Sequence, residues 1–76
     1  MERKHTITFD YDSVYIWTVD NTNPMSKYDI RWSVEHREVY EFMLEVAEDV
    51  PDLDPKLFMV IRDFFLHKKE EFLKNR

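Results

Sequence analysis

Residues 6–19 read TITFDYDSVYIWTV and predict the start of the fold. Residues 6–11 alternate polar and apolar side chains, which is the period of a strand with one buried face, and residues 14–19 are mostly β-branched or aromatic. Asp12 and Ser13 between the two runs predict a tight hairpin turn. A turn of these two residues sets the cross-strand pairs of one apolar face: Tyr11 with Val14, Phe9 with Ile16, and Ile7 with Thr18.

The other face of this hairpin carries an aromatic patch. Tyr15, Trp17 and Val19 fall on it, and a sheet covered by helices on one side only leaves them exposed. With Arg31 alongside from a third strand, Tyr15 and Trp17 form either a cation–π patch or a binding hot spot. The alternative is that the same aromatic residues are buried in the core or in a dimer.

The residues after the hairpin predict a third strand. The stretch 20–24 (DNTNP) is a turn cluster without glycine, in which asparagine and aspartate tolerate left-handed backbone geometry. Tyr28, Ile30 and Trp32 then alternate with polar residues. This alternation predicts a third antiparallel strand through residue 32.

The rest of the chain has helical periodicity. From about Val34 the apolar residues recur at spacings of three and four, and Pro51 predicts the end of this first helix. Asp54 and Pro55 predict the start of a second helix, as N-cap and first helical residue, which runs to about Leu73. We therefore predict an α+β fold (βββαα), in which a three-stranded antiparallel sheet is followed by two C-terminal helices packed on one face.

Length and composition limit the classes of function. The chain has 76 residues, which fits one domain over residues 1–76. It has no glycine, which excludes Walker, dinucleotide-binding, serine-hydrolase-elbow and EF-hand loops, and no cysteine, which excludes disulfides and thiolate chemistry. Its three histidines are far apart in sequence, and no serine has an adjacent base. We therefore predict no catalytic residues, no metal site and no cofactor.

Charge and hydropathy predict the cellular setting. The net charge of -5 disfavours direct binding to nucleic acids or to membranes, since both carry negative charge. The sequence starts with MERKH and continues with alternating residues, without the apolar core of a signal peptide. No window approaches the roughly 18 apolar residues of a membrane span. We expect a cytoplasmic protein.

Negative charge is concentrated in residues 35–54, which hold one arginine and eight carboxylates, a net charge of -7. On a helical wheel the carboxylates of the first helix form a ridge opposite the stripe of Val39, Met43 and Val46. We name as the acidic segment the seven residues expected to bind a partner: Glu35, Glu38, Glu41, Glu45, Glu48, Asp49 and Asp52.

Two interpretations of the acidic segment remain open. It is either a solvated surface, partly neutralised by Lys56, Arg62 or Arg76 of the second helix, or a docking face for a basic protein surface. In the second case the carboxylates imitate the phosphates of a nucleic acid and occupy the channel of a nucleic-acid-processing protein. By analogy of composition and size alone, small acidic inhibitors from phages act in this way.

The second helix predicts a further contact. Its apolar stripe is wide, and a flank made of Met59, Arg62, Leu66 and Leu73 extends beyond one buried face. This flank packs either on the first helix within the monomer or on a second copy. A homo-oligomeric structural or accessory protein is therefore the alternative function, because a short chain without disulfides gains stability by dimerising.

Overall fold

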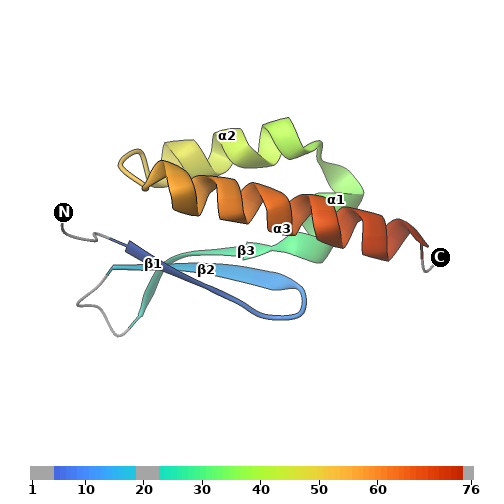
Figure 1. Ribbon diagram of the computed structural model, residues 1–76, viewed down its shortest axis with the longest axis horizontal. Coiled ribbons are helices and arrows are strands. Elements are labelled where there is room, and N and C mark those ends of the chain that lie inside the picture. Colours follow the sequence, from blue (N-terminus) through green and yellow to red (C-terminus); the bar gives the residue numbers. More distant parts are fainter. Residues whose placement is uncertain (1–4, 19–22, 75–76) are drawn as a thin grey trace.

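The computed structural model describes residues 5–18 and 23–74, and Figure 1 shows its helices gathered on one side of a three-stranded sheet. The α+β prediction is confirmed, with three helices instead of two. The elements in chain order are β1 (His5–Phe9), β2 (Ser13–Thr18), β3 (Pro24–Asp29), α1 (Ile30–His36), α2 (Val39–Asp49) and α3 (Pro55–Lys74). No helix in these described ranges is long and apolar enough to cross a bilayer.

The sheet is antiparallel in the order β1-β2-β3, but its hairpin register differs from the prediction by two residues. The observed partners of the inner face are Phe9 with Val14, Ile7 with Ile16, and His5 with Thr18. Residues 10–12 connect the two strands, and the Asp10 N–H donates to the Ser13 carbonyl at 2.8 Å. The favoured two-residue turns need positive φ, which no described residue has, in agreement with this longer connection. A shift of two keeps the side chains of both strands on their predicted faces, but Tyr11, predicted to pair with Val14, lies in the loop and is 54% exposed.

The third strand ends at Asp29, earlier than predicted. Ile30 opens α1, and the Asp29 carboxylate caps this helix by accepting the Trp32 N–H at 3.0 Å. Ile30, Ser33 and Val34 form the buried side of α1, while Trp32 is 48% exposed. Of the alternating apolar residues at 28, 30 and 32, only Tyr28 therefore lies in the strand, and the other two belong to α1.

The residues predicted to form one helix before Pro51 form two helices in the structure, α1 and α2. The chain is extended at Arg37 and Glu38, and α2 starts afresh with a capping box between Glu38 and Glu41. The predicted ends are otherwise confirmed: α2 stops before Pro51, and the Asp54 carboxylate accepts the Lys56 N–H at 2.8 Å at the start of α3.

The core lies between the sheet and the helices. Phe42 of α2 stacks on Phe65 of α3 with ring centroids 4.9 Å apart, and Tyr28 of β3 meets Phe42 edge-on at 5.5 Å. The fully buried side chains come from the sheet and all three helices: Val14, Ile16, Ile30, Phe42, Val46, Val50, Ile61 and Phe65. This core fixes α2 and α3 as rigid supports for their exposed faces.

Candidate functional site

The acidic segment lies on α1, on α2 and on the connection to α3, so it is not the continuous ridge of one helix that the sequence predicts. Glu35 belongs to α1, and the break at residues 37 and 38 separates it from the carboxylates of α2. Asp52 follows α2 in the turn before α3, with its side chain 57% exposed. The structure brings these seven residues to neighbouring elements but gives them different local roles.

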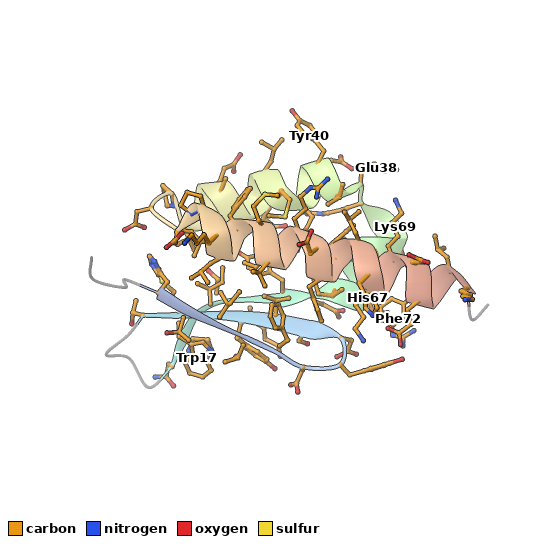
Figure 2. All side chains as sticks on the ribbon, viewed as in Figure 1. Trp17, Glu38, Tyr40, His67, Lys69 and Phe72 are labelled. Carbon is orange, nitrogen blue, oxygen red and sulfur yellow. The ribbon has the colours of Figure 1, made fainter. Side chains whose placement is uncertain are left out.

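Two of the carboxylates hold the start of α2. The Glu41 side chain accepts the backbone N–H of Glu38 at 3.1 Å as part of the capping box. The Glu38 carboxylate also lies 3.5 Å from Lys69 Nζ of α3 (Figure 2 labels both residues). Lys69 therefore neutralises Glu38, a role that was predicted for Lys56, Arg62 or Arg76. Arg62 instead pairs with Asp63, and Arg76 lies outside the described residues.

Glu45 has its own counter-ion. Arg37 Nη1 contacts the Glu45 carboxylate, with the two side chains 33% and 41% exposed. The extended backbone at Arg37 separates this residue from the helical repeat, which allows the guanidinium to reach back over α2. Arg37, the one arginine of residues 35–54, thus neutralises one carboxylate of α2.

Asp49 is tied to the sheet. Its carboxylate accepts a hydrogen bond of 2.7 Å from the Tyr28 hydroxyl, and Tyr28 is only 6% exposed. Burial, together with this bond, raises the pKa of Tyr28, because both favour the protonated phenol. Asp52 lies 3.9 Å from Nε2 of the buried His5. The Tyr28–Asp49 bond therefore joins β3 to α2, while Asp52 lies beside the first residue of β1.

Glu35 and Glu48 are the two members of the acidic segment whose carboxylates form no hydrogen bond or ion pair with any other described residue, and both are exposed. Glu48 lies on the outer face of α2, which we define as Tyr40, Glu41, Leu44 and Glu48. At about 100° per residue these four side chains fall within an arc of about 100°. The charge of this face is thus less neutralised than that of the side facing α3.

The outer face of α2 also contains two exposed apolar residues that the sequence analysis did not assign to a site. Tyr40 is 70% exposed and Leu44 is 45% exposed, and Figure 2 shows Tyr40 pointing away from the sheet. The sequence signal was present, since residues 40 and 44 share one side of a helix whose buried side is set by Phe42 and Val46. The result is an aromatic and aliphatic pair bordered by carboxylates.

A shallow groove of about 270 Å³ adjoins the start of α2. It lies where the end of α1, the start of α2 and the C-terminal half of α3 meet. Its lining combines acidic, basic and apolar side chains: Glu35, Glu38, Glu41, His36, Arg37, Lys69, Val34 and Leu73. The carboxylates and cations here largely neutralise one another, so the groove selects no single charge.

The flank of α3 is divided between core and surface. Leu66 is partly buried and packs against the core, as expected for a contact within the monomer. Met59 is 50% exposed and Leu73 is 46% exposed, and the Arg62 side chain is also exposed. Two separated apolar side chains therefore remain at the surface, in place of a continuous seam.

Tyr15 and Trp17 of the predicted aromatic patch lie on the open face of the sheet, but they are half-buried and Arg31 is not beside them. Tyr15 and Trp17 have ring centroids 6.3 Å apart, and Trp17 Nε1 donates to Thr8 Oγ1 at 2.8 Å. Arg31 belongs to α1 because β3 ends at Asp29, and its guanidinium lies 4.4 Å from the Phe72 ring centroid instead. Lys27 takes the place beside Tyr15, at 5.6 Å from the ring centroid. Val19 lies outside the described residues.

Among residues 5–18 and 23–74 no group of three or more histidine, aspartate or glutamate side chains is arranged to hold a metal ion. His36 stacks on Trp32, with ring centroids 4.6 Å apart, and its Nδ1 lies 2.9 Å from the Trp32 carbonyl.

Comparison with family models, with curated proteins and with solved structures gives no match.

Proposed function

We propose that this protein is a non-enzymatic, cytoplasmic interaction module that docks the outer face of α2 on a basic surface of a partner protein. The observation that carries the proposal is Tyr40, which is 70% exposed on the same face of α2 as Glu41 and Glu48. Tyrosine is enriched at the energetic centres of protein interfaces, because its large ring is ordered at little entropic cost. Leu44, one turn further along, extends the apolar contact.

The charges around Tyr40 set the chemistry of the partner. Glu48 on the same face and Glu35 on α1 have no described side-chain partner, so a partner's lysine or arginine can pair with them without displacing an internal contact. Complementary charge of this kind accelerates encounter and excludes acidic partners. The interaction is therefore expected to weaken as salt concentration rises.

We further propose that the partner is a nucleic-acid-processing protein, which the chain inhibits or regulates. Surfaces that bind a phosphate backbone are basic over an extended area, and residues 35–54, with a net charge of -7, complement such an area. A nucleic-acid channel contains side chains on which bases stack, and the exposed ring of Tyr40 offers the same side chains an aromatic surface. Occupation of the channel then excludes the nucleic acid.

Affinity capture from nuclease-treated lysate tests the proposal. The test variants are Tyr40→Ala and Glu48→Lys, since Glu38, Glu41 and Glu45 also hold the fold and their replacement confuses binding with stability. Glu70→Lys is the matched control, because Glu70 is an exposed carboxylate of α3 without a described partner.

The wild type and the control are expected to retain the same nucleic-acid-binding protein at low salt and to release it at high salt. The two test variants are expected to bind it at least about tenfold more weakly. Retention of the same proteins by all four chains, or of none by the wild type, would refute the proposal.

The exposure of Met59 and Leu73 favours a homo-oligomeric accessory protein as the second candidate. In this case the flank of α3 forms the contact between copies, and the acidic segment serves solubility. Sedimentation over a range of concentrations separates the two functions. A dimer that dissociates in the Met59→Glu variant and not in Tyr40→Ala supports the second candidate; a monomer at all concentrations rejects it.

A further inference from the structure

Three aromatic rings surround the ammonium group of Lys68. Its Nζ lies 4.0 Å from the ring centroid of Tyr11 and 5.7 Å from those of both Phe64 and Phe72. The two phenylalanines stand one turn before and one turn after Lys68 on the same side of α3, while Tyr11 comes from the loop between β1 and β2. All three distances are within the roughly 6 Å over which a ring attracts a cation.

The ammonium group is well removed from solvent. The Lys68 side chain is only 12% exposed, although lysine is strongly hydrated and is seldom buried without a partner. Glu71 Oε2, at 3.1 Å, is its carboxylate partner. The neighbouring Lys69 has no ring contact among the described residues and is 32% exposed, with Glu38 at 3.5 Å. Because Lys68 contacts the rings and Lys69 does not, variants of these two adjacent lysines distinguish the effect of losing the ring contacts from the effect of losing one positive charge.

The same rings join the hairpin to α3. Phe9 packs on Phe64 with centroids 4.4 Å apart, and Tyr11 meets Phe72 edge-on at 6.0 Å. In Figure 1 the loop between β1 and β2 lies beneath the C-terminal half of α3. Tyr11 is nevertheless 54% exposed, so apolar burial alone holds it weakly, and the Lys68 ammonium contacts its ring.

We propose that Tyr11, Phe64 and Phe72 form a binding site for an organic ammonium ion, which the chain's own Lys68 occupies, and that this occupancy fastens the β1–β2 loop to α3. The attraction is between the negative faces of the rings and a cation, so it needs the charge of Lys68 and not only its methylene chain. A shortened side chain at position 68 leaves Tyr11 and Phe64 without a cation, while Arg31 stays 4.4 Å from the Phe72 ring centroid, and a small ammonium ion from solution can then take the place of Lys68.

The first experiment compares amide hydrogen exchange of residues 10–13 in Lys68→Gln with that in Lys69→Gln. Both variants lose one positive charge, but only the first loses ring contacts. Lys68→Gln is expected to exchange about five- to tenfold faster in the loop. Glu71→Gln keeps the rings and the ammonium and is expected to change exchange less than Lys68→Gln. Equal exchange in the two lysine variants, or an effect of Glu71→Gln as large as that of Lys68→Gln, overturns the proposed role of the cation.

The second experiment adds tetramethylammonium to Lys68→Ala and follows its melting temperature. The ion is expected to raise the melting temperature of Lys68→Ala and not that of Lys68→Met, in which the side chain fills the site. Equal responses overturn the ammonium site. Wild-type NMR keeps the test valid if a variant does not fold: the Lys68 Hε protons are expected upfield of those of Lys69 because of the ring currents, and equal positions overturn the proposal.

Discussion

The hydrogen bond between Tyr28 and Asp49 connects the sheet to α2, and Tyr28→Phe removes it with little other change. The phenylalanine ring keeps the edge-on contact with Phe42 at 5.5 Å, while the 2.7 Å bond to the carboxylate is lost. Hydrogen bonds to charged groups contribute about 1.5–3 kcal/mol, and the exposure of Asp49 to water favours the lower end. We expect the free energy of unfolding to fall by about 1.5 kcal/mol, which lowers the melting temperature by about 6–12 °C.

Urea unfolding followed by tryptophan fluorescence measures this change, because Trp17 and Trp32 report on the sheet and on α1. The double-mutant cycle with Asp49→Ala, which removes the acceptor, separates the pair from other contacts of each residue. A coupling energy near zero, or a urea midpoint of Tyr28→Phe equal to that of the wild type, would refute the assigned bond.

The raised pKa of Tyr28 adds a pH dependence of defined sign. An unfolded tyrosine loses its proton near pH 10, whereas the buried Tyr28 keeps it to a higher pH. The stabilisation is therefore complete below about pH 10 and is lost above it, by up to about 1.4 kcal/mol per pH unit. The stability difference between the wild type and Tyr28→Phe should shrink as pH rises above 10. A difference that stays constant between about pH 9 and 12 would contradict the account.

Three further changes test the fold. Asp29→Ala removes the cap of α1 and should lower the free energy of unfolding by about 1 kcal/mol, with faster amide exchange confined at first to α1; exchange unchanged in α1 would speak against the cap. Phe65→Ala removes a fully buried ring and should cost about 3–5 kcal/mol in urea unfolding, so a loss below about 1 kcal/mol would contradict its core position. Lys69→Gln removes the partner of the 75% exposed Glu38 without touching the capping box of α2 and should change stability by no more than about 0.5 kcal/mol; a larger loss would show that the pair is more than a surface contact.

The sequence predicted the sheet faces and most helix ends because strong local signals mark them. The alternation around Val14 and Ile16 requires one buried face whatever the exact register, and both residues are fully buried. Pro51 and Asp54 mark a helix end and a helix start through backbone geometry that few alternatives satisfy. The register itself depends on loop geometry, which Asp12 and Ser13 do not specify.

The break between α1 and α2 had no comparable signal. No proline or glycine marks residues 37 and 38, and a glutamate at the N-cap is weaker than serine, threonine or aspartate. Three alternating apolar residues ending at Trp32 fit a strand, yet Asp29 could equally cap a helix, and tertiary packing of Ile30 and Val34 decides between them.

The candidate site was predicted in its charge but not in its geometry. Counting charges locates the acidic segment, but only the fold shows that Glu45 pairs with Arg37 and that Asp49 serves Tyr28. Tyr40 was not predicted to be part of the site, because a wheel drawn for one long helix does not show how far each residue of α2 is exposed to solvent.

Site-specific photo-crosslinking tests the docking of the outer face of α2 most directly. A photoreactive phenylalanine analogue replaces Tyr40 in one chain and Val60, a 43% exposed apolar residue of α3, in a control chain. We predict that irradiation in lysate joins position 40 to a basic, nucleic-acid-binding protein, that high salt suppresses this product, and that position 60 does not form it. The same products from both positions, or only copies of the chain joined to one another through position 40, would contradict it.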